Sequence, residues 1–152
     1  MKIAIDADCN GIQLKELLLE YFSGGTYMLE DLDYAGQHPD CDYPDVAFHL
    51  AQRVQCGEFD KGVLICGTGL GMAIAANKVK GVFAGSCSDI YAAERLAKSN
   101  NAQIIAIGAL VTGPESAKKI VTAFLESDFQ GGQSERKVSK IRQFEESTQA
   151  AL

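Results

Sequence analysis

The chain has 152 residues, of which 47% are hydrophobic and 22% are charged, and these values predict one globular domain over residues 1–152. Its net charge of −6, with no run of Lys or Arg, argues against nucleic acid or an anionic membrane surface as a partner. An anionic ligand would therefore have to be held by a local group of donors.

Strand and helix patterns alternate in the first part of the chain. A short apolar run at residues 2–6 predicts a buried strand that ends at carboxylates, and leucines at helical spacing predict a helix over residues 12–22. Residues 27–31 are a second strand candidate. Residues 35–41 are predicted to form a polar loop, and residues 45–56 a helix.

The following part begins with the most apolar segment. Residues 61–66 (KGVLIC) form a continuous apolar run, which is typical of a central parallel strand. A glycine-rich turn over residues 67–71 separates this strand from a predicted helix over residues 72–78. The remaining predicted elements are strands over 82–86 and 103–107 and helices over 89–99, 114–125 and 135–146.

This alternation predicts an α/β fold, a three-layer α/β/α, Rossmann-like domain with a five-stranded parallel sheet. In such sheets ligands bind at the carboxyl ends of the strands. We therefore expect the site at residues 6–11, after the first strand, and at residues 66–71, after the third. We assign residues 99–101, just before the fifth strand, to the same edge.

Gly67, Gly69 and Gly71 form a G-x-G-x-G turn between a buried strand and a helix. Glycine lets an oxyanion approach the backbone closely, and the amino end of a helix favours negative charge. The spacing differs from the dinucleotide fingerprint and from the P-loop, so a nucleotide-binding Rossmann domain is a weaker hypothesis. A tight turn that binds no ligand is the alternative.

Cys66 lies at the end of the central strand, directly before this turn. The amino end of the following helix would favour its thiolate form, which suits a residue that accepts and returns protons. The alternative is an inert cysteine, since free cysteine is among the residues most often buried. The adjacent anion-binding turn adds weight to the functional interpretation.

Polar residues next to the first and fifth strands are candidates for binding a sugar. Asp6 or Asp8 could accept hydrogen bonds from sugar hydroxyls, or could cap the helix that follows. Asn100 and Asn101 could bind a polyol or a developing enolate, because an amide donates and accepts at once. Turn formation accounts for the two asparagines equally well.

A metal site could be assembled only from Asp8, Cys9, His38 and Cys41, whose spacings match no known ligand pattern, so no metal is predicted. The other histidine, His49, lies in a helical pattern and is expected at or near the surface. Without a second usable histidine, a Ser–His–Asp triad is not expected.

The five cysteines have irregular spacings and no C-x-x-C, which predicts free thiols in a reducing compartment. The first residues form a short apolar strand without the apolar stretch of a signal peptide. No segment approaches the ~18 consecutive apolar residues of a membrane span. A cytoplasmic location is therefore expected.

Residues 65–71 (ICGTGLG), continued by residues 73–78 (AIAANK), closely resemble a signature of the RpiB/LacA/LacB family of sugar-phosphate isomerases. This family includes ribose-5-phosphate isomerase B and galactose-6-phosphate isomerase. The DYP sequence at residues 42–44 and the segment at residues 99–102 (SNNA) resemble two further motifs of the family, and residues 113–121 match in order and spacing. The resemblance covers nearly the whole chain.

This resemblance implies a sheet with strand order 2-1-3-5-4 and a homodimer or tetramer whose active sites are shared between subunits. It implies aldose–ketose isomerisation of a sugar phosphate through a cis-enediol, with no cofactor and no metal. The C-terminal helix, residues 134–152, would pack on a partner subunit.

The resemblance also implies roles for individual residues. Cys66 would move the proton between two carbons, Thr68 would assist at the oxygen, and the turn amides would stabilise the enediolate. Asp8 and Asn100 would hold substrate hydroxyls. The residues expected to bind substrate are Asp8, Cys9, Tyr43, Gly67, Gly69, Leu70, Gly71, Ser99, Asn100, Arg136 and Lys137.

The chain departs from the family at residues that handle cyclic sugars and phosphate. Cys9 and Ser99 stand where the family has histidines, the second of which opens the sugar ring. Gln133 and Lys137 stand where it has phosphate-binding arginines, and Lys is a weaker substitute for a bidentate Arg. Our first expectation is a different substrate, less dependent on phosphate or already open-chain.

Two alternatives to a changed substrate remain open. Residues elsewhere in the chain could have taken over, with His38 or Tyr43 opening the ring and Arg136 and Lys137 binding the anion. The chain could also pair with a second subunit that carries the missing histidine. The alternative function is a catalytically weakened homologue that binds a sugar phosphate or serves as a partner subunit.

Overall fold

Five parallel strands form one sheet in the order β2-β1-β3-β5-β4. A computed structural model of the chain describes residues 1–149. The strand order agrees with the one that the family resemblance implies. The strands are β1 (Ile3–Ala7), β2 (Leu29–Asp31), β3 (Lys61–Cys66), β4 (Ala84–Ser86) and β5 (Ile104–Gly108).

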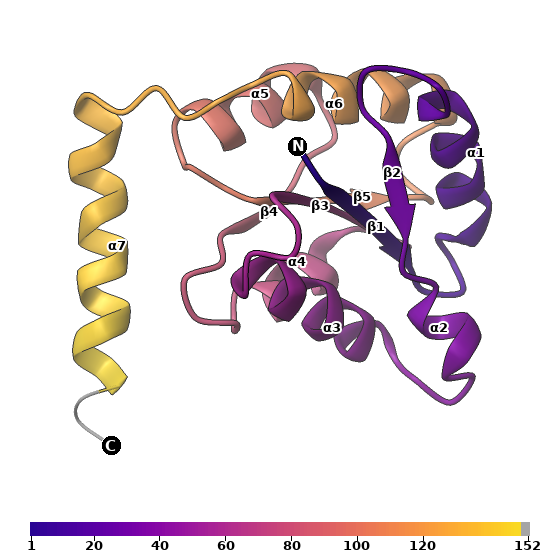
Figure 1. Cartoon of the computed structure of the whole chain (residues 1–152), viewed down its shortest axis with the longest axis horizontal. Coiled ribbons are helices and arrows are strands. Elements are labelled where there is room, and N and C mark those ends of the chain that lie inside the picture. Colours follow the sequence, from indigo (N-terminus) through magenta and orange to yellow (C-terminus); the bar gives the residue numbers. More distant parts are fainter. Residues whose placement is uncertain (150–152) are drawn as a thin grey trace.

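Helices cover both faces of this sheet (Figure 1). On one face lie α1 (Ile12–Phe22), α5 (Ile90–Lys98) and α6 (Pro114–Leu125), and their apolar side chains form one core with the strands. On the other face lie α3 (Tyr43–Gln55) and α4 (Leu70–Ala76), which form the second core. The predicted three-layer α/β/α, Rossmann-like fold is confirmed.

The neighbouring strands β1 and β3 are buried along their whole length, which explains their mostly apolar sequences. In the register of this pair, Ala7 of β1 lies beside Ile65 of β3. The next residue, Asp8, donates its N–H to the Ile65 carbonyl over 3.1 Å. The pairing therefore brings the loop after β1 directly beside Cys66, the last residue of β3.

A short helix, α2 (Tyr34–Gln37), corrects the prediction of a polar loop over residues 35–41. Asp33, its N-cap, has a left-handed backbone with φ of 46°. An added Cβ at Gly36 would lie 2.5 Å from the Asp33 carboxylate, so glycine leaves room for that side chain. The helix also depends on Asp6, which accepts a hydrogen bond from its first N–H, and a local pattern cannot reveal this partner.

The last helix, α7 (Gln133–Gln149), stands apart from the sheet and its covering helices (Figure 1). It is longer at both ends than the predicted 135–146. Val138 is buried, and Glu145 accepts the N–H of Gly81 over 3.0 Å, but Ile141 and Phe144 are exposed. No helix among residues 1–149 is long and apolar enough to cross a membrane.

Candidate active site

A cavity of about 610 Å³ opens at the carboxyl ends of β1 and β2. Its walls come from the loop after β1, the start of α1, the segment that follows β2 and the start of α3. Three of the predicted substrate-binding residues, Asp8, Cys9 and Tyr43, lie in these walls. The expectation of a site at the carboxyl edge after the first strand therefore coincides with this cavity.

Asp8 shapes the loop after β1 as well as lining the cavity. Its Oδ1 accepts the N–H groups of Asn10 over 2.9 Å and of Gly11 over 3.2 Å. Gly11 packs so closely on β3 that an added Cβ would lie 2.6 Å from the Ile65 carbonyl oxygen. The N-cap of α1 is Gly11 and receives no side-chain cap, so Asp8 shapes the turn before the helix instead of capping it, and it also lies in the cavity wall.

The glycine turn holds the sulfur of Cys66. The Cys66 side chain is 5% exposed, and its Sγ accepts the N–H of Gly69 over 3.1 Å. Gly69 has a left-handed backbone with φ of 78°, which turns this N–H back toward the strand end. Thr68 is exposed, and among residues 1–149 its own N–H has no hydrogen-bond acceptor.

Two residues connect the cavity to this turn. Asn10 lines the cavity, and its Nδ2 would lie 3.9 Å from a Cβ added at Gly67. Tyr43 also lines the cavity, and its ring would lie 2.6 Å from a Cβ added at Gly71. The cavity and the turn are therefore neighbouring parts of one surface. Glycine at position 71 lets the tyrosine ring rest against the backbone.

The start of α3 fixes Tyr43. Asp42 and Asp45 form a capping box, in which the Asp42 N–H donates to Asp45 Oδ2 over 2.9 Å. Pro44 occupies the first turn, where a missing N–H costs nothing. The DYP sequence thus has a structural role, because it starts the helix that presents the tyrosine to the cavity.

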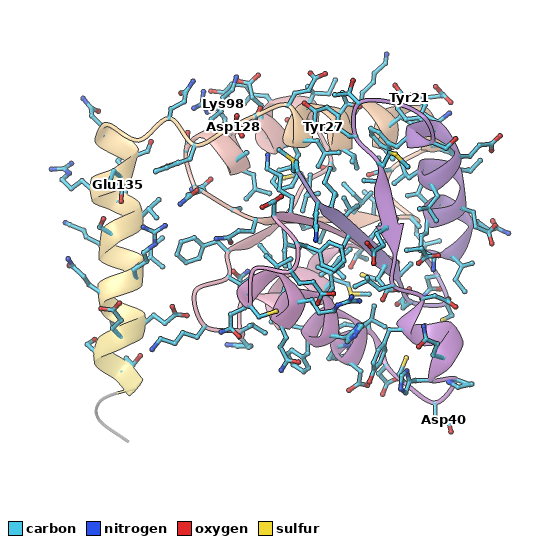
Figure 2. All side chains as sticks on the ribbon, in the orientation of Figure 1. Tyr21, Tyr27, Asp40, Lys98, Asp128 and Glu135 are labelled. Carbon is cyan, nitrogen blue, oxygen red and sulfur yellow. The ribbon has the colours of Figure 1, made fainter. Side chains whose placement is uncertain are left out.

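Ser99 and Asn100 lie at the opposite edge of the sheet, which corrects their assignment to the carboxyl edge. All strands are parallel, so a segment that precedes β5 lies at the amino ends of the strands. Figure 2 accordingly shows Lys98, the last residue of α5, far from Asp40 in the segment after β2. Ser99 Oγ accepts a hydrogen bond from Arg95 Nε over 2.9 Å.

Arg136 and Lys137 are also remote from the cavity of their own chain. They are exposed residues of α7. Their neighbour Glu135 lies at the opposite end of the molecule from Asp40 (Figure 2). Within the described chain, the structure therefore brings Asp8, Cys9 and Tyr43 together at the cavity, whereas the predicted cations Arg136 and Lys137 lie elsewhere.

The cavity of the single chain is acidic. Asp8, Glu16 and Asp42 line it, and its one lining cation, Lys15, is 5% exposed and paired with Asp31 at 2.8 Å and Asp33 at 3.7 Å. Burial and, to a smaller extent, nearby acidic groups raise the pKa of the Cys41 thiol. An anionic group would need additional cations to bind here.

Neither histidine lines the cavity. The His38 ring stacks on Tyr34 with 4.1 Å between ring centroids, and the centroid of the His49 ring lies 4.7 Å from that of Tyr34. Burial lowers the pKa of His49. Among residues 1–149 no three His, Cys, Asp or Glu side chains are grouped so that they could hold a metal ion.

The predicted substrate-binding residues did not include Lys15 or Asn10, although Asn10 lies within the expected site range 6–11. A lysine among Leu14, Leu18 and Phe22 on the buried face of α1 is the signal that could have revealed a buried ion pair. Asn10 carries only a weak signal, a third polar residue after Asp8. Asp6, a candidate for binding sugar hydroxyls, is a fully buried member of β1.

Replacing Gly69 by Ala is expected to lower the free energy of unfolding by about 2–4 kcal/mol and to reduce kcat more than tenfold. The new Cβ would lie 2.7 Å from Ser86 Oγ and 3.1 Å from the Ile107 carbonyl carbon, in a left-handed backbone. Gly57→Ala is the matched control, because Gly57 has φ of 81° but nothing within 4 Å. Equal losses in urea unfolding of the two variants would contradict the expected close packing at Gly69.

Similarity to known proteins agrees with this geometry. Residues 3–141 match the family described as Ribose/Galactose Isomerase. The chain belongs to this family. The D-erythrulose-4-phosphate isomerase of Pectobacterium atrosepticum is 47% identical over 147 residues, which cover 95% of each chain. The 4-deoxy-4-sulfo-D-erythrose isomerase of a Clostridium strain, MSTE9, is 36% identical over 129 residues, which cover 85% of this chain and 81% of that protein.

A solved structure of a relative supports the same family membership. Ribose-5-phosphate isomerase B of Clostridium thermocellum superposes with a TM-score of 0.90 at 39% identity, over 97% of this chain and 99% of the other. The predicted membership of the RpiB/LacA/LacB family is confirmed. The chain is an aldose–ketose isomerase, the class of enzyme to which its sugar-phosphate isomerase relatives belong.

Proposed function

We propose that this isomerase acts on a four-carbon sugar that carries an anionic group at C4, such as D-erythrulose 4-phosphate, and that Cys66 moves the proton. The choice of sugar rests on Ser99, which stands where the family has its ring-opening histidine. Its hydroxyl is not an effective base at neutral pH and is engaged with Arg95. Neither histidine reaches the cavity wall to replace it.

A sugar of this kind needs no ring-opening residue. A five-membered sugar ring closes through the hydroxyl at C4, and in a tetrose 4-phosphate that oxygen is esterified. A 4-sulfo group likewise leaves no hydroxyl at C4. The substrate therefore stays open-chain, and the relatives from Pectobacterium and Clostridium, named for sugars of this kind, support the proposal.

The proposed chemistry uses residues at the end of β3. Cys66 removes the proton from the carbon next to the carbonyl, a proton moves between the two oxygens, and Cys66 returns its proton to the other carbon, so atoms and charge balance. The free N–H of Thr68 would hold the oxygen that becomes negative in the enediolate. Asp8 and Asn10 in the cavity wall would bind the remaining hydroxyls.

We also propose that two copies of the chain complete each site. A phosphate needs cations, and in the described chain the cavity offers only the paired Lys15. Arg136 and Lys137 of one copy, with Ser99 and Asn100, would then face the cavity of the other. A homodimer or tetramer is the simplest assembly, and a different partner subunit would be needed only if the chain alone is inactive.

Exposed apolar residues beside the glycine turn support such an assembly. Leu70 is 60% exposed, Ile74 64% and Leu110 77%. Large apolar side chains gathered at one place on a surface are typical of protein interfaces. The exposed Ile141 and Phe144 of α7 would add to the contact, which is the role expected for the C-terminal helix at residues 134–152.

The five cysteines are all free in the structure, which fits a reducing compartment, and we propose the cytoplasm as the location. We propose that residues 1–152 act as one domain, without an organic cofactor, because proton transfer between adjacent carbons of an open-chain sugar requires only an acid/base and a group that stabilises the oxyanion.

A substrate panel tests the choice of sugar. We expect kcat/KM for D-erythrulose 4-phosphate to exceed that for D-ribose 5-phosphate by at least about 100-fold, since acid–base help is worth about 10²–10⁴-fold and none is available for ring opening. Incorporation of deuterium from heavy water at C1 and C2, followed by NMR, reports the proton transfer directly. Free D-erythrulose is the control for the anionic group.

Two results would count against the proposal. Equal kcat/KM for the pentose phosphate would show that ring opening is catalysed, and the choice of a four-carbon substrate would fail. Saturable binding of every sugar phosphate without any deuterium exchange would favour the alternative, a catalytically weakened homologue or partner subunit.

A further inference from the structure

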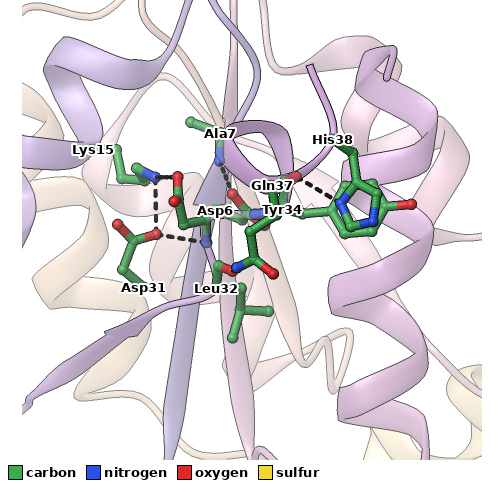
Figure 3. A network of polar contacts seen from close by, with 9 residues as sticks. Asp6, Ala7, Lys15, Asp31, Leu32, Tyr34, Gln37 and His38 are labelled. Atoms are coloured by element: carbon green, nitrogen blue, oxygen red, sulfur yellow. Dashed lines mark hydrogen bonds and ion pairs between the residues drawn. The ribbon is translucent and has the colours of Figure 1, made fainter. Parts of the chain in front are cut away.

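Asp6 is a fully buried carboxyl group in the middle of the network that holds one wall of the cavity (Figure 3). Its Oδ1 accepts the N–H of Ala7 over 2.8 Å, and its Oδ2 accepts the N–H of Tyr34 over 3.2 Å. One side chain of β1 thus binds both its own strand and a residue 28 positions further along the chain. Asp6 does not itself line the cavity.

The residue that Asp6 holds begins the wall-forming part of the chain. We call residues 32–42 the wall segment, because Asp33, Ala35, Gly36, Pro39, Cys41 and Asp42 all line the cavity. Its first residue is fixed by a backbone bond, from the Leu32 N–H to the Ile5 carbonyl over 3.1 Å. Asp33 is held by Asp31, whose Oδ1 accepts the Asp33 N–H over 3.0 Å, and the following residue is held by the bond between Tyr34 and Asp6.

Beyond this point the wall segment is held mainly by its own bonds. The N–H and Nδ1 of His38 both lie about 3 Å from the Tyr34 carbonyl, and the Cys41 N–H donates to the His38 carbonyl. Gln37 Nε2 donates to the Leu32 carbonyl over 3.1 Å. A shift of Tyr34 would therefore move the segment as a unit.

We propose that Asp6 is a positioning residue, whose ionised carboxylate fastens the wall segment to β1 and thereby sets the affinity of the cavity for the substrate. This inference rests on the proposal above that the substrate binds in this cavity. An ionised carboxylate offers two acceptor oxygens, one for each N–H. A protonated carboxyl or an amide has one oxygen that accepts well, so one of the two bonds is lost.

Charges around Asp6 come from several elements. Burial has the largest effect and raises the pKa of Asp6 to about 6, while Lys15 of α1 lowers this pKa and Asp31 of β2 raises it. The Cys41 thiol of the wall segment feels the Asp6 charge, and the rings of His38 and His49 lie against Tyr34. Asp6 is therefore expected to change charge near pH 6.

Asp6→Asn mimics the protonated state, because it keeps the shape and offers one acceptor oxygen. With D-erythrulose 4-phosphate as the probe, we expect KM of D6N to exceed the wild-type KM about fivefold at pH 7.5, since a lost hydrogen bond is worth about 1 kcal/mol. At pH 5 the ratio should approach one. The kcat should change less than KM.

The ratio is the informative quantity, because the phosphate of the probe itself changes charge near pH 6 and affects both proteins alike. Asp60→Asn is the matched control. Asp60 also accepts a backbone N–H, that of Lys2 over 2.7 Å, but it lies at the amino end of the sheet. The KM of Asp60→Asn should equal that of the wild type at both pH values.

A measurement on the unaltered protein keeps the inference testable if D6N does not fold. The amide proton of Tyr34, followed by NMR, should shift with a midpoint near pH 6, where the Asp6 pKa lies. The absence of such a shift between pH 4.5 and 7.5, or a KM ratio for D6N that is the same at both pH values, would overturn the inference. A folded D6N with wild-type KM at pH 7.5 would overturn it as well.

The difference in stability between wild type and D6N should change with pH in a defined direction. The Asp6 pKa is about 6 in the folded chain against an ordinary value of 3.8, so the folded chain binds the proton more tightly than the unfolded chain. The free energy of unfolding of wild type minus that of D6N should be greatest below pH 3.8, where both side chains are uncharged, and should fall as the pH rises to about 6. These outcomes do not depend on the choice of substrate, so failure of the proposed function would be recognised separately.

Discussion

The Cys66→Ala variant is expected to lose about 10²–10⁴-fold in kcat, the usual contribution of a positioned acid or base, while KM stays close to that of the wild type. Among residues 1–149, Cys66 Sγ accepts a hydrogen bond only from the turn that follows it, and Cys66 does not line the cavity, so its removal leaves the cavity walls in place. Deuterium exchange at C1 and C2 of D-erythrulose 4-phosphate should fall in parallel with turnover.

Cys87→Ala is the matched control for this variant. Cys87 is the other buried cysteine of the chain, and burial raises the pKa of its thiol to about 11, so it is protonated at neutral pH. Its removal should leave kcat within about twofold, because a thiol that stays protonated at neutral pH cannot remove a proton from the substrate. Full activity of Cys66→Ala would reject Cys66 as the proton-transferring residue, whatever the identity of the sugar.

The fold could be predicted from the sequence because each buried strand is recognisable from its own run of apolar residues. The run KGVLIC of β3 and the apolar start of β1 are buried on both faces, and such strands need no alternating pattern. The order of the strands is not a local property and came from the family resemblance. The helical turn at Tyr34 was missed for the same reason, since its first N–H is satisfied by Asp6, far away in the chain.

The site could be predicted only in part. The residues near the cavity were predicted in the right place, whereas Ser99 and the cations were not. The turn at Gly69 and the carboxylate of Asp8 act through short-range geometry, a left-handed residue and two neighbouring N–H groups, which a sequence pattern can indicate. Ser99 and Lys137 stand at family positions in the sequence, yet they lie away from the cavity of their own chain. A sequence pattern identifies such residues without stating which copy of the chain they serve.

If cations of one copy complete the cavity of another, two inactive variants should restore each other. Replacing both Arg136 and Lys137 by Ala should lower kcat/KM about 100-fold, since charge-assisted hydrogen bonds are worth about 1.5–3 kcal/mol each. Lys140→Ala is the matched control, because Lys140 is an exposed lysine of the same helix without a proposed role, and its activity should be unchanged.

Mixing this double variant with Cys66→Ala, by unfolding and refolding the two chains together at equal concentration, should recover about one quarter of the wild-type activity. Half of the randomly formed dimers contain one chain of each kind, and in each of these one site receives Cys66 from one copy and the cations from the other, while the second site lacks both. If each site were built within one chain, no mixed dimer would contain an intact site, and activity would remain at the mean of the two inactive variants. The quarter recovery thus separates a site shared by two copies from a site in which α7 serves its own chain.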